Sequence, residues 1–144
     1  MRMRRSAGAL ILIIALIMAV PAIAEPLKDA KKAYDRGDYQ TAVRLYKPLA
    51  NEGDPEAQYA LGYMYRTGKG VRKDHVKAHM WFNIAISQLS PLEYDRRKLV
   101  ESNRDLVAVQ MTPDQIAKAQ KWAGEWKPKK EKQKQKPEER RTAR

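Results

Sequence analysis

The sequence has no cysteine and only two histidines. Without cysteine the chain cannot form a disulfide-stabilised scaffold, a thiolate zinc site, an iron–sulfur cluster or a cysteine nucleophile. Its four serines lack the Gly-x-Ser-x-Gly context of an activated nucleophile. Carboxylates in the middle of the chain are mixed with lysine and arginine, as on a solvated surface. We therefore expect no enzyme activity, no cofactor and no metal.

The two histidines, His75 and His79, are four residues apart on a predicted helix, a spacing that can hold a metal ion. No third histidine accompanies them, and the glutamate of the zinc-protease motif is missing. Lys73 and Lys77 would also repel a cation. We interpret both histidines as structural or solvated side chains.

Positive charge is concentrated at the two ends of the sequence. The 144 residues include 29 Lys+Arg and 17 Asp+Glu, which gives a net charge of +12. Residues 1–24 contain three arginines and no acid, and residues 127–144 contain nine Lys+Arg and three Glu. The middle, residues 25–126, contains 17 basic and 14 acidic residues and reads as one mildly basic globular domain.

Residues 1–24 have the three parts of a secretory signal peptide. Three arginines precede an uncharged apolar run over residues 7–20, and small residues then stand at positions 22 and 24, where signal peptidase reads. A bilayer span needs about 20 apolar residues, so cleavage between Ala24 and Glu25 is favoured over an uncleaved anchor. We expect an exported bacterial protein, periplasmic or secreted, where the lack of cysteine avoids stray disulfides.

Residues 25–126 carry strong helix signals and no alternating strand pattern. Asp38, Asp54, Ser90 and Thr112 stand where N-caps are expected, the last three followed by proline. Glycines at 37, 53 and 68 mark helix ends. We expect an all-α fold of about six helices, near residues 26–36, 39–51, 55–66, 74–88, 91–109 and 113–125.

These helices repeat with a period of 36 residues. Asp38 and Ala42 correspond to Asp74 and Ala78, and a bulky residue follows each alanine three positions later. A fixed period in the 30s is typical of a helical solenoid, in which small residues allow close helix contact.

Residues 57–85 contain a characteristic pattern of small, aromatic and glycine positions. The pattern consists of Ala57, Gln58, Leu61, Gly62, Tyr65, Gly68, Gly70, Val71, Asp74, Ala78 and Trp81. It resembles the Sel1-like repeat, a relative of the tetratricopeptide repeat. The resemblance implies a short right-handed solenoid of helical hairpins that binds proteins or peptides without catalysis. We expect a consensus repeat near residues 54–89, a less typical half repeat before it, and a capping hairpin near 90–126 anchored by Ile116, Ala119, Trp122 and Trp126.

Tyr59, Tyr63 and Arg66 share one face of the helix expected at 55–66. In repeats of the kind resembled, the first helix of each pair lines the concave groove, so these three side chains are candidate partner contacts. Tyrosine and arginine are also the side chains that most often anchor interfaces. The alternative is that both tyrosines only pack against the next hairpin.

Residues 127–144 are almost entirely Lys, Gln, Glu, Pro and Arg, so we expect a disordered basic tail. It is either a solubilising tail or a binder of anionic lipid or envelope polymer; export argues against nucleic acid. Two functions stay open: an exported scaffold that holds a partner protein or peptide in its groove, and a basic envelope adaptor that binds an anionic surface through this tail.

Overall fold

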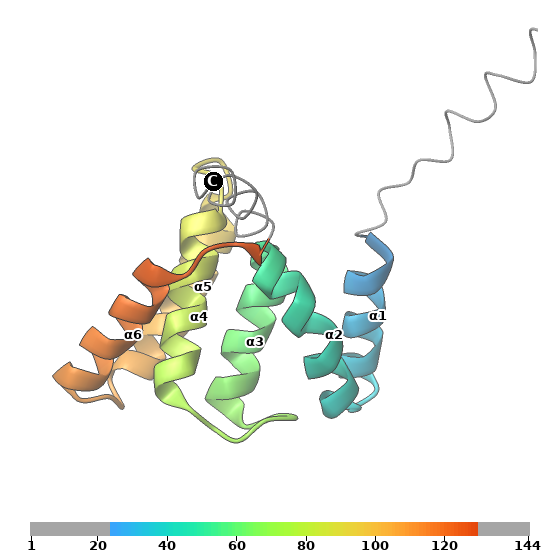
Figure 1. The fold of residues 1–144 in the computed structure, drawn as a ribbon, viewed down its shortest axis with the longest axis horizontal. Helices are drawn as coiled ribbons and strands as arrows, with labels where there is room; N and C mark the ends of the chain where they lie inside the picture. Colours follow the sequence, from blue (N-terminus) through green and yellow to red (C-terminus); the bar gives the residue numbers. More distant parts are fainter. Residues whose placement is uncertain (1–23, 130–144) are drawn as a thin grey trace, which may run out of the picture.

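The computed structural model describes residues 24–129, and within that range it contains six α-helices and no β-strand (Figure 1). The helices are α1 (Ala24–Asp35), α2 (Tyr39–Glu52), α3 (Pro55–Thr67), α4 (His75–Gln88), α5 (Tyr94–Ala108) and α6 (Pro113–Glu125). The expected all-α fold is confirmed. The expected signal peptide, apart from Ala24, and the tail beyond residue 129 lie outside the described residues. None of the six described helices is long and apolar enough to cross a membrane.

Side-chain caps fix the helix starts that the sequence predicted. The carboxylates of Asp38, Asp54 and Asp74 each accept a hydrogen bond from the backbone N–H three residues later, at 3.2, 2.8 and 3.0 Å. Thr112 and Gln115 form the predicted capping box. Because free N–H groups at a helix start need acceptors, these residues define where α2, α3, α4 and α6 begin.

The predicted N-cap at Ser90 is wrong, because α5 begins at Tyr94. The Ser90 hydroxyl accepts from the backbone N–H of Leu92 at 3.3 Å, and the backbone N–H of Glu93 donates to the Ser90 carbonyl at 3.0 Å. These bonds close a turn over residues 90–93. The Ser90 hydroxyl is therefore engaged in this turn and does not cap a helix. The Glu93 carboxylate still accepts a hydrogen bond from the Ser90 N–H at 2.9 Å, which is one of the two bonds of a capping box.

Two glycines allow backbones to approach closely. A Cβ on Gly62 would lie 2.6 Å from the ring of Phe82, so the glycine lets α3 contact α4 directly. A Cβ on Gly70 would overlap the carbonyl oxygen of Tyr39, and Gly70 has a φ of +71°. The loop between α3 and α4 therefore lies against the start of α2, and half-buried Val71 packs this loop onto the core.

The core consists of two clusters along the solenoid. The first joins α1, α2 and α3 to one side of α4 and includes Ala42, Leu61 and Trp81. The second joins α4 to α5 and includes Ala78 and Phe82. Ala42 and Ala78 are both fully buried, as expected for equivalent positions where helices meet.

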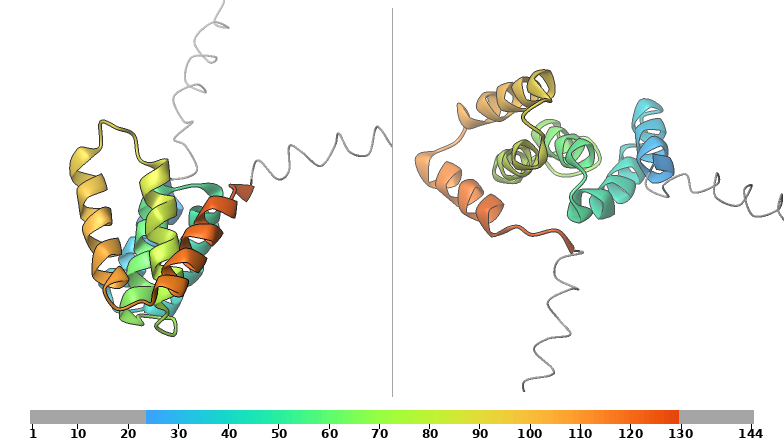
Figure 2. Two further views of the ribbon diagram at one scale, coloured as in Figure 1. Left: turned by 90° about the vertical axis from the view of Figure 1, so that its left-hand side faces the viewer. Right: turned by 90° about the horizontal axis from the view of Figure 1, so that it is seen from above.

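The C-terminal helices differ from the expected capping hairpin. Both α5 and α6 pack extensively on α4, but they make almost no contact with each other. Seen from above, they diverge on either side of α4 (Figure 2). Residues 90–126 therefore cover α4 from two sides instead of stacking as one hairpin.

The segment after α6 crosses back toward the first repeat (Figure 1). Trp126 packs against the first core cluster, and the Pro128 ring lies about 3.8 Å from the position of a Cβ on Gly53. Of the expected anchors of α6, Ala119 is fully buried and Ile116 is half-buried. Trp122 is 37% exposed, so its expected core role is wrong. Ala123, four residues after Ala119, packs against the first core cluster instead.

Candidate functional site

Helix α3 places Tyr59, Tyr63 and Arg66 together, as the sequence predicted. The rings of Tyr59 and Tyr63 are 6.5 Å apart, and the Arg66 guanidinium carbon lies 4.7 Å from the centre of the Tyr63 ring. All three side chains are half-buried. Tyr59 also stacks at 5.9 Å on Phe82 of the core, so this tyrosine both packs internally and faces outward.

The outward side of these tyrosines lines a hollow of about 270 Å³ between α1, α2 and α3. Tyr34 and Tyr46 complete a wall of four phenol rings. The hollow is formed by the following residues: Lys31, Tyr34, Asp35, Tyr46, Glu56, Tyr59, Ala60 and Tyr63. The sequence did not predict Tyr34 and Tyr46 as site residues, because they reach the hollow from α1 and α2 only once these helices pack on α3.

A smaller hollow of about 50 Å³ continues this surface toward α5. It shares Glu56 and Tyr59 with the first hollow and adds Arg96 and Leu99. Arg96 joins α5 to α3 through an ion pair with Glu56 at 3.3 Å. Leu99 is 52% exposed. We name the two connected hollows the tyrosine groove. It runs from α1 across α3 to α5.

Burial affects the pKa of two of the groove phenols. It raises the pKa of Tyr59, and it raises the pKa of Tyr46 to about 12, with the Glu56 carboxylate adding to the effect. A neutral phenol can donate one hydrogen bond and also present an apolar ring. The groove thus offers aromatic contact area and hydrogen-bond donors over the whole physiological pH range.

Beside the groove, three tyrosines surround the ammonium group of Lys69. Its Nζ lies 5.1, 5.0 and 5.8 Å from the ring centres of Tyr34, Tyr39 and Tyr63. It also donates a hydrogen bond of 3.1 Å to the Tyr34 hydroxyl, which raises the pKa of Lys69. These contacts join the α3–α4 loop to α1 and α2 and so hold the groove tyrosines in position.

The other residues of the repeat pattern pack in the interior or end a helix. Ala57 and Leu61 are fully buried, and Gln58 is buried with its Nε2 donating to the Ala50 carbonyl at 3.0 Å. Tyr65 is half-buried below the Lys77 ammonium, and Gly68 ends α3 with a φ of +74°.

The histidines lie outside the groove. His79 is 3% exposed, and its Nδ1 lies 3.0 Å from Nδ2 of Asn83. Burial lowers the pKa of His79, and the nearby Arg104 acts in the same direction. Among the described residues, no three His, Asp or Glu side chains converge on a point that could hold a metal ion.

The stacked helical hairpins and the open groove define an α-helical repeat protein. The family model of the Sel1 repeat matches residues 28–54 and 55–88. These residues therefore form two Sel1 repeats, a type of repeat that typically serves as a protein–protein interaction module and generally acts as a non-catalytic scaffold. No solved structure matches the chain significantly.

Proposed function

We propose that this protein is an exported, non-catalytic scaffold that holds a partner protein or peptide in the tyrosine groove. The observation that carries the proposal is the groove itself. Four tyrosines from three helices line one open hollow, which continues to exposed Leu99 on α5. Exposed apolar and aromatic side chains that gather in a concavity are typical of binding surfaces.

The groove has the features of an interface centre. Tyrosine and arginine supply most hot spots because they combine a large apolar area with a polar end. Arg66 lies over the Tyr63 ring but outside the lining of the two hollows, and the ion pair of Arg96 and Glu56 lies beside Leu99 at the edge of the groove. A partner that covers these rings would displace water from apolar area while the rim groups fix its orientation.

Binding of a partner is tested by a Tyr59→Ala, Tyr63→Ala double variant. We expect loss of the partner from a pull-down of envelope extract while the circular dichroism spectrum stays helical. Tyr94→Ala is the matched control, because Tyr94 is 63% exposed on α5 and does not line the groove. Retained capture by the double variant would contradict the proposal.

The alternative, an adaptor that binds an anionic lipid or polymer through the basic tail, makes a different prediction. Deleting residues 130–144 would then abolish capture, and rising salt would weaken it steeply. For groove binding, the same deletion should slow association at low salt and leave capture intact. The deletion begins after Lys129 because Trp126 and Pro128 contact the first repeat.

A further inference from the structure

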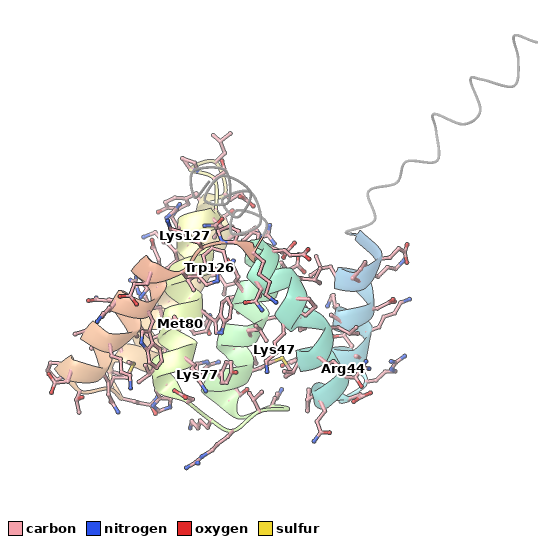
Figure 3. All side chains as sticks on the ribbon, viewed as in Figure 1. Arg44, Lys47, Lys77, Met80, Trp126 and Lys127 are labelled. Carbon is pink, nitrogen blue, oxygen red and sulfur yellow. The ribbon has the colours of Figure 1, made fainter. Side chains whose placement is uncertain are left out.

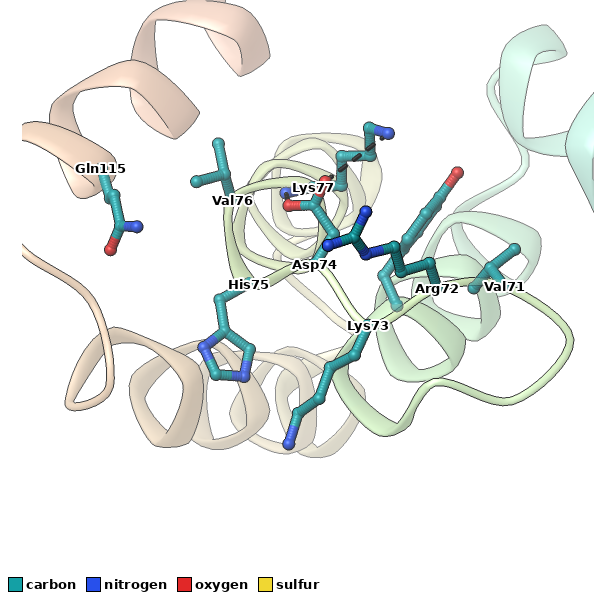
Figure 4. A pocket seen from close by; sticks show the side chains of 9 residues that line it. Val71, Arg72, Lys73, Asp74, His75, Val76, Lys77 and Gln115 are labelled. Atoms are coloured by element: carbon teal, nitrogen blue, oxygen red, sulfur yellow. Dashed lines mark hydrogen bonds and ion pairs between the residues drawn. The ribbon is translucent and has the colours of Figure 1, made fainter.

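A second hollow, of about 740 Å³, lies between the α3–α4 loop, the start of α4 and the start of α6 (Figure 4). Its lining is Tyr65, Gln115 and the continuous segment 71–77. It shares no residue with the tyrosine groove. Tyr65 lies on α3 away from the face that Tyr59 and Tyr63 present to the groove.

The walls of this hollow are cationic. Arg72, Lys73 and Lys77 extend from them, and Asp74 is the one carboxylate of the lining (Figure 4). Asp74 is already engaged, because it caps α4 through the Lys77 N–H and pairs with the Lys77 ammonium at 3.5 Å. Arg72 and Lys73 are exposed and form no ion pair within residues 24–129.

Positive charge extends from this hollow over one side of the molecule. Figure 3 shows Arg44, Lys47, Lys77 and Lys127 toward the viewer, on α2, on α4 and after α6. The segments on this side, namely α2, residues 71–74, α4, α6 and residues 126–129, contain nine Lys+Arg and four Asp+Glu (Figure 2). The helices α1, α3 and α5 contain eight Lys+Arg and seven Asp+Glu, so they are nearly neutral. The excess positive charge therefore belongs to the side with the hollow, which we name the basic face.

Apolar groups lie within the basic face. Val71, Val76 and Tyr65 line the hollow, and Met80 and Trp126 are half-buried on the same side of α4 (Figure 3). A polyphosphate has no apolar group that would fill such a lining. A membrane surface requires apolar side chains that protrude, whereas the large exposed apolar residues of the described chain lie on α5, in the residues that flank it and on α6.

We propose that the basic face binds an acidic segment of a partner protein, which places an apolar side chain in the hollow beside Val71 and Val76. The acidic residues of the segment pair with Arg72, Lys73 and Arg44, and its apolar residue covers lining that is otherwise exposed to water. The sequence that follows residue 129 contains seven Lys+Arg and three Glu. This site is independent of the tyrosine groove.

The test measures fluorescence anisotropy of a short labelled peptide in which Glu and Asp alternate with leucine, titrated with the full chain. An Arg44→Glu, Arg72→Glu double variant should weaken binding by about tenfold or more, because both cations face the peptide and neither has an ion-pair partner in the described residues. Lys28→Glu, Lys98→Glu is the control with the same change in net charge, on α1 and α5. It should weaken binding by less than about threefold, since screening limits distant charges.

Three further comparisons separate the alternatives. A peptide with serine in place of leucine should bind at least about fivefold more weakly, if the hollow takes an apolar side chain. Equal weakening by both charge variants would mean that only net charge matters and would overturn the proposal. It would also be overturned if deletion of residues 130–144 abolished binding, or if phosphatidylglycerol vesicles bound through the same residues while the peptide did not. The Tyr59→Ala, Tyr63→Ala variant should retain the peptide.

Discussion

The ammonium group of Lys69 donates a hydrogen bond to the hydroxyl of Tyr34 across 35 residues of sequence, at 3.1 Å. This contact joins the loop of the second repeat to the last turn of α1. The rings of Tyr39 and Tyr63 complete the enclosure, so one cation contacts side chains from three helices. Lys69 thereby links the two repeats beside the tyrosine groove.

Replacing Lys69 should therefore destabilise the fold. Lys69→Met keeps most of the aliphatic length and removes the cation, so we expect a lower urea midpoint with an unchanged slope. Lys31→Met is the control, because its ion pair with Asp35 is exposed and contributes little. Tyr34→Phe keeps the ring and should have a smaller effect than Lys69→Met. Equal midpoints for wild type and Lys69→Met would contradict the linking role.

Two glycines on helices should respond in opposite directions to alanine. Gly62→Ala should cost about 1–3 kcal/mol of unfolding free energy, because the new methyl overlaps the buried ring of Phe82. Gly124→Ala should stabilise by about 0.5–1 kcal/mol, since a Cβ there meets nothing within 4 Å and alanine favours the helix. Denaturation midpoints measure both. A neutral Gly62→Ala would mean that α3 and α4 are farther apart than described.

Stability should fall as the pH drops through 6.5 because of His79. Burial lowers its pKa in the folded state, so below the unfolded value of 6.5 the unfolded chain binds the proton first. The contribution is fully present above that value and is lost as the pH falls toward the folded pKa. In thermal melts across this pH range, the melting temperature of the wild type should fall with falling pH. The melting temperature of His79→Gln should change less. Identical slopes in the two proteins would rule out this assignment.

The mature protein should begin at Glu25. The small residues at positions 22 and 24 follow an apolar run that has signal-peptide length, so signal peptidase should cleave after Ala24. N-terminal sequencing of the protein recovered from an exporting host measures this. The net charge would then fall from +12 to +9, because three arginines leave with the leader. An intact Met1 in the membrane fraction would contradict export with cleavage.

The features that local chemistry controls were predictable from the sequence. The caps at Asp38 and Asp54 depend only on the next three residues, and the close approach at Gly62 follows from its place in the repeat pattern. The Ser90 cap failed because its hydroxyl bonds to Leu92 instead, a choice between two local geometries that the sequence leaves open. The same local motif therefore has different outcomes at different sites.

The site was only partly predictable, for a different reason. Tyr59, Tyr63 and Arg66 share a helix face, so helical spacing alone brings them together. The participation of Tyr34 depends on how α1 approaches α3, and that of Leu99 depends on how α5 approaches α3. Such distances between helices arise from packing over the whole solenoid, so they cannot be predicted from a short sequence motif.

Site-specific photocrosslinking tests the central claim, that the tyrosine groove holds the partner, most directly. A photoreactive phenylalanine analogue replaces either Leu99, which lines the groove, or Tyr94, which lies five residues earlier on α5 outside it. Both side chains are more than half exposed, so either substitution should preserve the fold. After irradiation of exporting cells, we expect one discrete higher-mass adduct from position 99 and none from position 94. An adduct from position 94 alone, or equal adducts from both, would contradict the account.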